Sequence, residues 1–445
     1  MEIKEMNFTK GRVSSNLLKF ALPFLGSSFF QQLYSTTDGI IVGKFVGKTG
    51  LAAIDSVYNF LKLPTLFFIG ISMGATIILS QYYGAGEKSE MSVVAHTIMT
   101  FSLMSGFAAS LLGIFFAPDI LYLLQIPNDI YVMTLSYVQI YFCGLVASLI
   151  FNSTAGILRA MGDSRTPFYI MGFACLINVV LDLLFVAKLK MGVAGAAMAT
   201  IIVQFLGAFI IVKVFMNSKN EIVFGWQKLK IKWEKLKSIV KMGLPLALQS
   251  AIYPFANMLI QTRINNTGTD NIAAYALCGK LDFIVWPVTE SIGMAVTTFV
   301  AQNYGAKLFY RVKQGMKTGI ALAVGTITIL DVILFIFCEQ IGKLFLASCD
   351  HNVIPIMAHL LRFLLPFNLF YVVAEILCAV IRGRGETFRP MIITLVCTCG
   401  IRVLWIMVAV NQESTIKMIL TSYPLSWIIN GIAFIVFYRN FAIRS

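Results

Sequence analysis

The stretch LKFALPFLGSSFFQQLYSTTDGIIVG, from Leu18 to Gly43, is the part of the sequence that best indicates the fold. It is apolar enough to enter a bilayer, yet it contains Pro23 and Asp38. A proline inside a helix removes one backbone hydrogen bond and tends to kink the chain. A carboxylate at bilayer depth is costly, so such residues usually face a cavity or a pathway. We therefore expect the rest of the chain to place partners beside Asp38.

The composition is that of a polytopic membrane protein. The 445 residues are 58% hydrophobic and only 13% charged, about half the charged fraction of an average soluble protein. The net charge of +14 lies between apolar spans rather than on a soluble basic face, so no nucleic-acid partner is expected. The cysteines and histidines show no metal-ligand spacing, and the sequence has no phosphate loop or nucleophile elbow. These observations predict neither an enzyme nor a cofactor.

The apolar pattern predicts an all-α integral membrane protein with twelve transmembrane helices. An even number of spans places both termini on one side of the membrane. The side that holds the termini carries most of the lysines and arginines, so it should be cytoplasmic. The predicted spans are residues 16–43, 51–80, 93–116, 131–156, 167–187, 192–216, 238–262, 272–301, 316–337, 355–381, 390–410 and 416–438.

The two halves of the chain resemble each other in one register. Three pairs of segments match at an offset of 221 to 223 residues: LKFALPF with VKMGLPL, SQYYGAG with AQNYGAK, and LRAMGDSRTP with IRGRGETFRP. Six spans per half give both halves the same orientation, which is a parallel repeat. This predicts an N-lobe at residues 1–212, a basic cytoplasmic linker at 213–237 and a C-lobe at 238–445. Proteins with such repeats usually move a substrate between the halves by alternating access.

These motifs resemble the multidrug and toxic compound extrusion (MATE) family over nearly the whole chain. The matching features are the prolines of spans 1 and 7, the QYYGA end of span 2, the LRAMGD loop, NVVLD at 178–182 and GVAGAAMAT at 192–200. The resemblance implies a secondary active antiporter that exports organic cations and other drugs in exchange for H⁺ or Na⁺. It implies an N-lobe polar site at Asp38, Asn178, Asp182 and Thr200. One branch of the family has a glutamate where this chain has Tyr253, so the C-lobe Na⁺ site of that branch is not expected here.

The residues themselves support one polar site in the first half. Asp38 and Asp182 each lie six residues before an outer lysine, and Thr200 lies eight residues into a span that descends from the same side. Asn178 and Asp182 are four residues apart and share a helix face. Two carboxylates that converge at this depth resist double ionisation, so the set is a candidate site for a proton or Na⁺. The alternative is that each acid is interfacial and hydrated.

Four further residues are candidates for helix bending or for substrate contact. Pro23 is expected to let the first span bend beside Asp38. Tyr34, Glu290 and Glu375 are candidate substrate contacts, the tyrosine by a cation–π interaction. The alternatives are that Tyr34 packs or faces lipid and that the two acids are structural partners of membrane-embedded cations.

A multidrug efflux antiporter in the plasma membrane is therefore predicted, acting as a monomer on small and mainly cationic drugs. The competing hypothesis is a flippase for a lipid-linked cell-envelope precursor. A flippase would favour a basic central cavity, whereas the polar residues of the first half are acidic.

Overall fold

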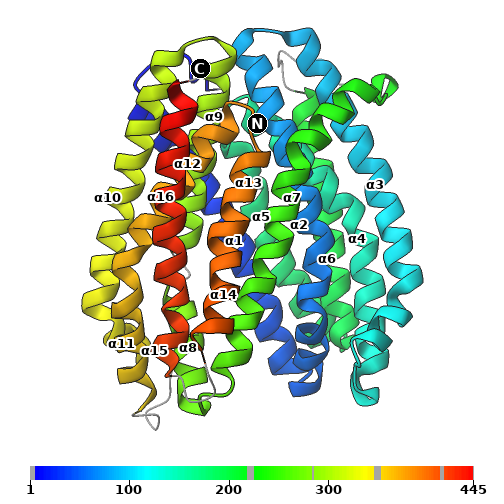
Figure 1. Cartoon of the computed structure of the whole chain (residues 1–445). Coiled ribbons are helices and arrows are strands. Elements are labelled where there is room, and N and C mark those ends of the chain that lie inside the picture. The colour runs from blue at the N-terminus through cyan, green and yellow to red at the C-terminus, as the bar shows by residue number, and fades with distance from the viewer. Residues whose placement is uncertain (1–5, 218–224, 283–284, 345–351, 411–414, 444–445) are drawn as a thin grey trace. The chain divides into compact units, whose positions relative to one another are not determined.

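The computed structural model of the protein describes residues 6–217, 225–282, 285–344, 352–410 and 415–443. Within these ranges the secondary structure is helical, with no strand, and the helices form twelve runs (Figure 1). This confirms the predicted all-α class, with one helical run for each predicted span. A helix satisfies its backbone hydrogen bonds within the segment, as a bilayer requires.

Six runs come from the first half of the sequence. They are α1 (Val13–Phe45), α2 (Lys48–Ala85), α3 (Lys88–Leu123), α4 (Asn128–Ala160), α5 (Arg165–Asp182) continued by the π-helix η1 (Leu183–Lys188), and α6 (Gly192–Asn217).

The second half supplies six more, preceded by the short 3₁₀ turn η2 (Trp226–Lys228). They are α7 (Trp233–Ile264), α8 (Thr269–Asp282) with α9 (Val285–Gly305), α10 (Phe309–Gly342), α11 (Val353–Leu364) with η3 (Leu365–Phe367) and α12 (Asn368–Gly383), α13 (Phe388–Thr394) with η4 (Leu395–Gly400) and α14 (Ile401–Val408), and α15 (Ile416–Leu420) with α16 (Ser422–Ile443).

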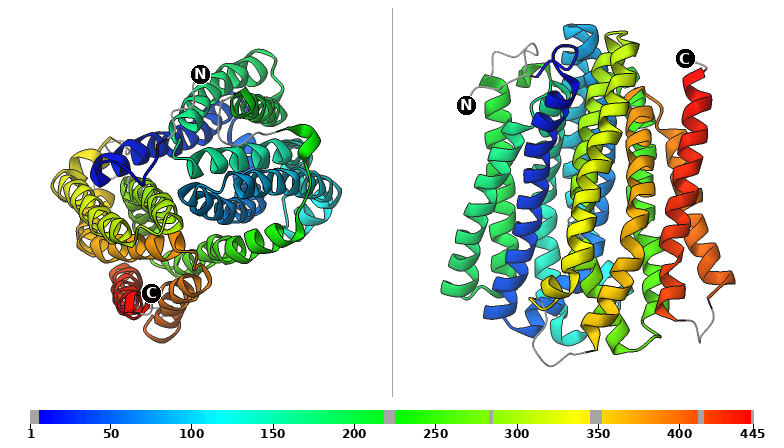
Figure 2. Two further views of the ribbon diagram at one scale, coloured as in Figure 1. Left: turned by 90° about the horizontal axis from the view of Figure 1, so that it is seen from above. Right: turned by 90° about the vertical axis from the view of Figure 1, so that its left-hand side faces the viewer.

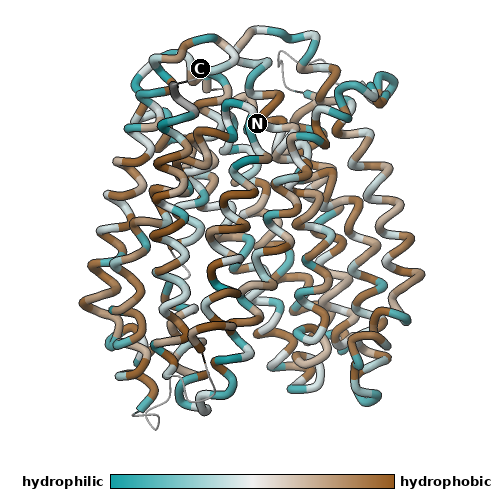
Figure 3. Tube along the Cα trace, in the orientation of Figure 1, coloured by the Kyte–Doolittle hydropathy of each residue, from teal (hydrophilic) through white to brown (hydrophobic). Residues whose placement is uncertain are grey.

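Most helices extend further than the predicted spans because the polar residues at their ends remain helical. Hydrophilic residues accordingly gather at the helix ends and hydrophobic ones along their middles (Figure 3). Helix α6 continues to Asn217 and α7 begins at Trp233, so both helices enter the segment 213–237 predicted as a linker. In the part of the chain that the structure describes, eleven runs are long and apolar enough to cross a membrane. The remaining run is α1, whose polar residues between Gln31 and Asp38 lower its hydropathy.

The contacts divide the chain into two compact units. Unit 1 comprises Met1–Asn7 and Leu22–Ala247, and unit 2 comprises Phe8–Ala21 and Leu248–Ser445. Two of the three boundaries fall inside a long helix. The one at Leu22 lies one residue before Pro23 in α1, and the one at Ala247 lies two residues after Pro245 in α7, whereas the boundary between Asn7 and Phe8 precedes α1. The predicted lobes, 1–212 and 238–445, remain a proposal.

Unit 1 is organised around α4, which packs against α2, α3 and α6. At the crossing of α2 and α7 the two backbones approach each other through small residues. A Cβ atom on Gly70 would lie 2.4 Å from the Ala247 nitrogen, and one on Gly74 would lie 2.5 Å from the Gly243 nitrogen. Gly70 and Gly74 on α2, like Gly243 and Ala247 on α7, are four residues apart. This is the small-xxx-small spacing that permits close helix packing in membranes.

Substitution of Gly74 by alanine should therefore destabilise unit 1. The added methyl group meets backbone, which cannot rotate away, so we expect a loss of about 1–3 kcal/mol. Thermal unfolding of the purified protein measures this. Gly43→Ala is the matched control, because a Cβ at Gly43 meets nothing within 4 Å. Equal melting temperatures for the two variants would contradict the close crossing.

Unit 2 is built on α9, α10, α12 and α16, which pack in sequence against one another, and Figure 2 shows these helices running alongside each other. Its N-terminal strap, defined as Phe8–Ala21, is anchored by the buried Phe8. The Phe8 ring contacts Phe20 and Phe299, and its backbone N–H donates to Oε1 of Gln302 at 3.0 Å. The strap therefore packs at a defined position in the core of unit 2.

Candidate functional site

The first-half polar residues converge from three helices of unit 1. Asp38 comes from α1, Asn178 and Asp182 from α5, and Thr200 from α6. The side-chain amide of Asn178, with its nitrogen toward the acids, donates to Oδ1 of Asp38 at 2.8 Å and to Oδ2 of Asp182 at 3.2 Å. Thr200 Oγ1 donates to Oδ2 of Asp38 at 3.4 Å. We call these four residues the carboxylate cluster.

Local helix geometry explains why the carboxylate cluster forms. Asn178 and Asp182 are separated by four residues, so both face the same neighbour. Asp182 is the last α-helical residue before the π-helix η1. π-helical turns are rare in proteins, and those that occur frequently lie at functional sites. The neutral amide between the two acids holds both carboxylates with one donor group.

Three of the four residues of the carboxylate cluster are buried, Asp38 is half-buried, and the cluster is not fully satisfied. Asn178 and Asp182 have no exposed surface and Thr200 is 4% exposed. Oδ1 of Asp182 is buried and accepts no hydrogen bond from the described residues. A buried unpaired carboxylate oxygen is costly unless a proton or a cation neutralises it.

This arrangement can hold a small monovalent cation or a proton. The carboxylate, amide and hydroxyl oxygens are hard donors of the kind that hard cations select. Among the described residues no group of three or more His, Cys, Asp or Glu side chains could hold a metal ion. The carboxylate cluster thus offers two acids and neutral neighbours, in which protonation of one acid relieves the repulsion between them.

The three candidate substrate residues lie in different surroundings. Tyr34 lies four residues before Asp38 on α1, so its side chain is on the same helix face as the carboxylate cluster. Glu290 lies on α9 and is exposed. Glu375 on α12 forms an ion pair at 3.2 Å with Arg382. The structure therefore brings only Tyr34 to the carboxylate cluster.

Arg382 lies one residue beyond the predicted span 355–381, which would place it in a loop on the cytoplasmic side. It is 7% exposed in the last turn of α12, and its Nη2 donates to Oε1 of Gln249 at 2.8 Å. Helix α12 continues to Gly383 because the run Ile376–Ile381 is buried. Glu375 is thus the counter-ion of a buried guanidinium.

Pro23 lies inside α1, ten residues from its first residue. The helix continues through it, and the carbonyl of Pro23 accepts a hydrogen bond from Ser27 Oγ at 3.0 Å. Pro245 likewise lies within α7 rather than at its beginning. A bend at Pro23 remains a prediction.

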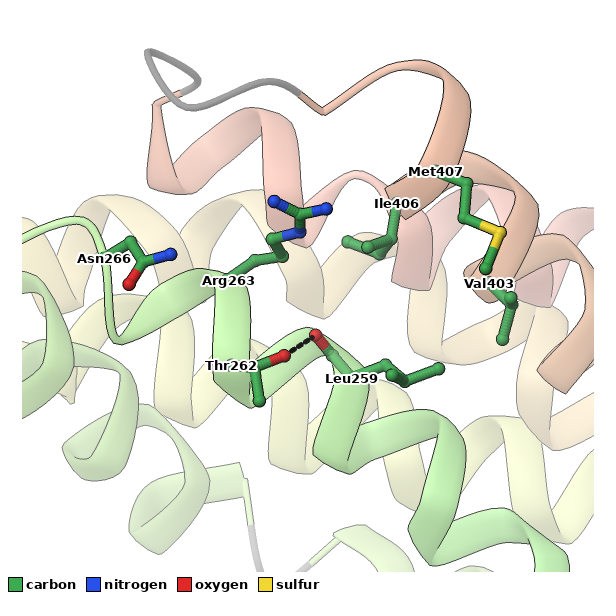
Figure 4. Close-up of a pocket in the computed structure, with 7 residues that line it drawn as sticks. All are labelled: Leu259, Thr262, Arg263, Asn266, Val403, Ile406 and Met407. Atoms are coloured by element: carbon green, nitrogen blue, oxygen red, sulfur yellow. Dashed lines mark hydrogen bonds between the residues drawn. The ribbon is translucent and has the colours of Figure 1, made fainter.

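A separate hollow of about 250 Å³ lies in unit 2 between α7 and α14 (Figure 4). Its lining includes Arg263 from α7 and Val403 and Met407 from α14. It shares no residue with the carboxylate cluster.

The long apolar helices are those of a polytopic membrane protein. The family model MatE matches residues 23–184 and again residues 245–408. The chain belongs to the multidrug and toxic compound extrusion (MATE) family. The double match, one in each half of the chain, also supports the internal repeat.

Curated relatives span most of the chain. It is 28% identical over 403 residues to the probable multidrug resistance protein YoeA of Bacillus subtilis, covering 89% of this chain and 86% of that protein. It is 24% identical over 408 residues to the probable multidrug resistance protein NorM of Thermotoga maritima, covering 90% and 87%. A FAD transporter of Shewanella oneidensis is 25% identical over 439 residues, covering 95% and 93%.

Solved structures show the same fold. A crystal structure of MATE in the straight conformation superposes with a TM-score of 0.89 at 21% identity, covering 99% of this chain and 98% of that one. An outward-facing MATE transporter of the MOP superfamily gives 0.88 at 20% identity, with the same coverage. Together with the family match, the relatives make this chain a membrane transporter with small-molecule substrates.

Proposed function

We propose that this protein exports small organic cations in exchange for H⁺ or Na⁺, and that the carboxylate cluster is the coupling site. The observation that supports this most directly is the pair Asp38 and Asp182 on one amide donor, with one oxygen of Asp182 that accepts no hydrogen bond from the described residues. The probable multidrug resistance function of YoeA and NorM supports the cargo class.

In the proposed mechanism, the drug competes with the coupling ion for the carboxylate cluster. A proton or Na⁺ on the carboxylate cluster removes negative charge and weakens the binding of a cationic drug to the same region. A bound drug likewise opposes proton binding, because linkage between two ligands is reciprocal. Antiport follows when each ligand favours the conformation that opens to its own side of the membrane.

The lobes 1–212 and 238–445 would alternate access, with Pro23 allowing α1 to bend beside Asp38. Both termini would face the cytoplasm, with the protein in the plasma membrane, because the basic residues concentrate on that side. Nothing in this scheme requires more than one copy of the chain.

Everted membrane vesicles test the proposal. The membrane potential is clamped with K⁺ and valinomycin, and ethidium accumulation is measured by rapid filtration. Vesicles with an acidic, Na⁺-free lumen should accumulate ethidium if H⁺ is the coupling ion. Vesicles loaded with Na⁺ at equal pH should do so if Na⁺ is. Accumulation that needs neither gradient, or that appears equally in vesicles without the protein, would exclude antiport.

A further inference from the structure

Unit 2 contains a buried guanidinium that pairs with no carboxylate of the described residues. Arg402, the second residue of α14, has no exposed surface. Among the described residues no aspartate or glutamate forms an ion pair with it. A charge at bilayer depth is costly, and an ionisable residue there is by default a functional candidate.

Neutral groups hold part of this side chain. Its Nε donates to Ser426 Oγ at 3.1 Å, and its Nη1 donates to Asn257 Oδ1 at 2.9 Å. The guanidinium carbon lies 5.2 Å from the ring centroid of Tyr253 and 4.3 Å from that of Tyr423. The Tyr253 side chain also lies within hydrogen-bonding reach of the guanidinium, whereas the aromatic faces attract the cation without accepting its in-plane hydrogen bonds.

Two hydrogen-bond donors near Tyr423 have no acceptor among the described residues. Guanidinium has five N–H groups and no acceptor, and Nη2 of Arg402 is buried without a partner among the described residues. The indole N–H of Trp427 is also buried without one in that part of the chain, and its ring lies 5.7 Å from that of Tyr423. Two unsatisfied donors beside one tyrosine, together with a net positive charge, match a ligand that supplies anionic oxygens.

In the internal repeat, Arg402 and its contacts correspond to the carboxylate cluster but carry the opposite charge. The carboxylate cluster uses the first, fifth and sixth helical runs, and the Arg402 contacts use α7, α14 and α16, which belong to the seventh, eleventh and twelfth. At the 223-residue offset of the LRAMGDSRTP pair, Asn178 corresponds to Ile401, next to Arg402. Corresponding runs therefore carry acids in one half and a guanidinium in the other.

The surroundings provide room for approach. Tyr253 and Asn257 are only half-buried, one turn apart on α7. The hollow between α7 and α14 (Figure 4) is lined by neither Arg402 nor any of its contacts, so it is a separate feature. The π-helix η4 ends two residues before Arg402, and π-helical turns accompany functional sites.

We propose that Arg402, with Asn257 and Ser426, binds the oxyanion of a transported molecule, so that the substrates include amphoteric compounds bearing a carboxylate or phosphate as well as a cation. This deepens the proposed export function and rests on it for the transport of the ligand. The cationic part of such a molecule is not assigned to these residues.

A matched pair of dyes tests the assignment. The protein in phosphatidylcholine nanodiscs is titrated with a rhodamine that carries a free carboxylate and with the methyl ester of the same dye, by fluorescence polarisation. Charge-assisted hydrogen bonds predict about tenfold tighter binding of the carboxylate form. Arg402→Gln should reduce this ratio to about one, and Arg402→Lys should retain part of it.

Asn257→Asp keeps the test decisive if Arg402→Gln fails to fold. It gives Arg402 an internal counter-ion, so the carboxylate preference should disappear while thermal stability is kept or raised. Arg362→Gln is the control, because that guanidinium already pairs with Glu339 at 3.0 Å. A wild-type ratio of one, or an unchanged ratio in folded Asn257→Asp, would overturn the proposal. Export of the methyl ester under an ion gradient reports separately on the proposed function.

Discussion

Asp38→Asn and Asp182→Asn should each abolish gradient-driven drug accumulation while the protein still folds and reaches the membrane. Each substitution preserves the shape of the side chain and removes the group that exchanges a proton or binds Na⁺. Neutralising a buried acid removes a desolvation cost, so stability should be unchanged or higher. The loss of transport would then reflect chemistry rather than unfolding.

The measurement is ethidium accumulation in clamped everted vesicles, with thermal unfolding of the same purified variants. Asp119→Asn is the matched control, since this acid is exposed near the end of α3. In wild type, drug affinity should rise with pH, because deprotonation restores negative charge to the carboxylate cluster. The size of this change should be on the order of tenfold, typical of coupling between two ligands.

Asp38→Asn should flatten that pH dependence. If both single variants kept gradient-driven transport, coupling would have to use other acids, and the exposed Glu290 would be the first to examine. If only one variant lost transport, the remaining carboxylate would be a neighbour rather than a member of the exchanging pair.

The carboxylate cluster could be predicted from the sequence because its geometry depends on helical spacing and depth. The positions of Asp38 and Asp182 relative to the outer lysines placed them at one level, and the four-residue spacing of Asn178 and Asp182 placed both on one face. What spacing could not show was the bridging amide or the oxygen of Asp182 that accepts no hydrogen bond from the described residues. Those depend on how the helices pack.

The second half was less predictable because its charges depend on partners from other helices. Arg402 was visible as a charge at membrane depth, but its neighbours Asn257 and Ser426 come from helices distant in sequence. Glu375 and Arg382 could have been paired from sequence, since seven residues are two helical turns. The predicted span 355–381 left Arg382 outside the helix, because hydropathy alone cannot tell a buried arginine in a last turn from one in a loop.

Glu375→Gln should destabilise unit 2, because it leaves the buried Arg382 without a counter-ion. Removing one partner of a fully buried ion pair costs about 3–5 kcal/mol. The side chain of Glu375 is 23% exposed, and glutamine can still accept a hydrogen bond, so we expect a loss of about 2 kcal/mol. Glu339→Gln is the control, because its pair with Arg362 is exposed on both sides and should contribute under about 1 kcal/mol.

The double variant Glu375→Gln/Arg382→Gln separates a structural role from a substrate contact. With both charges removed, no uncompensated cation remains, so much of the lost stability should return in a double-mutant cycle of thermal unfolding. Ethidium affinity should match wild type in both the single and the double variant when folded. An affinity that falls in the single variant and stays low in the stabilised double variant would instead assign Glu375 to the drug, since only a direct contact is lost in both.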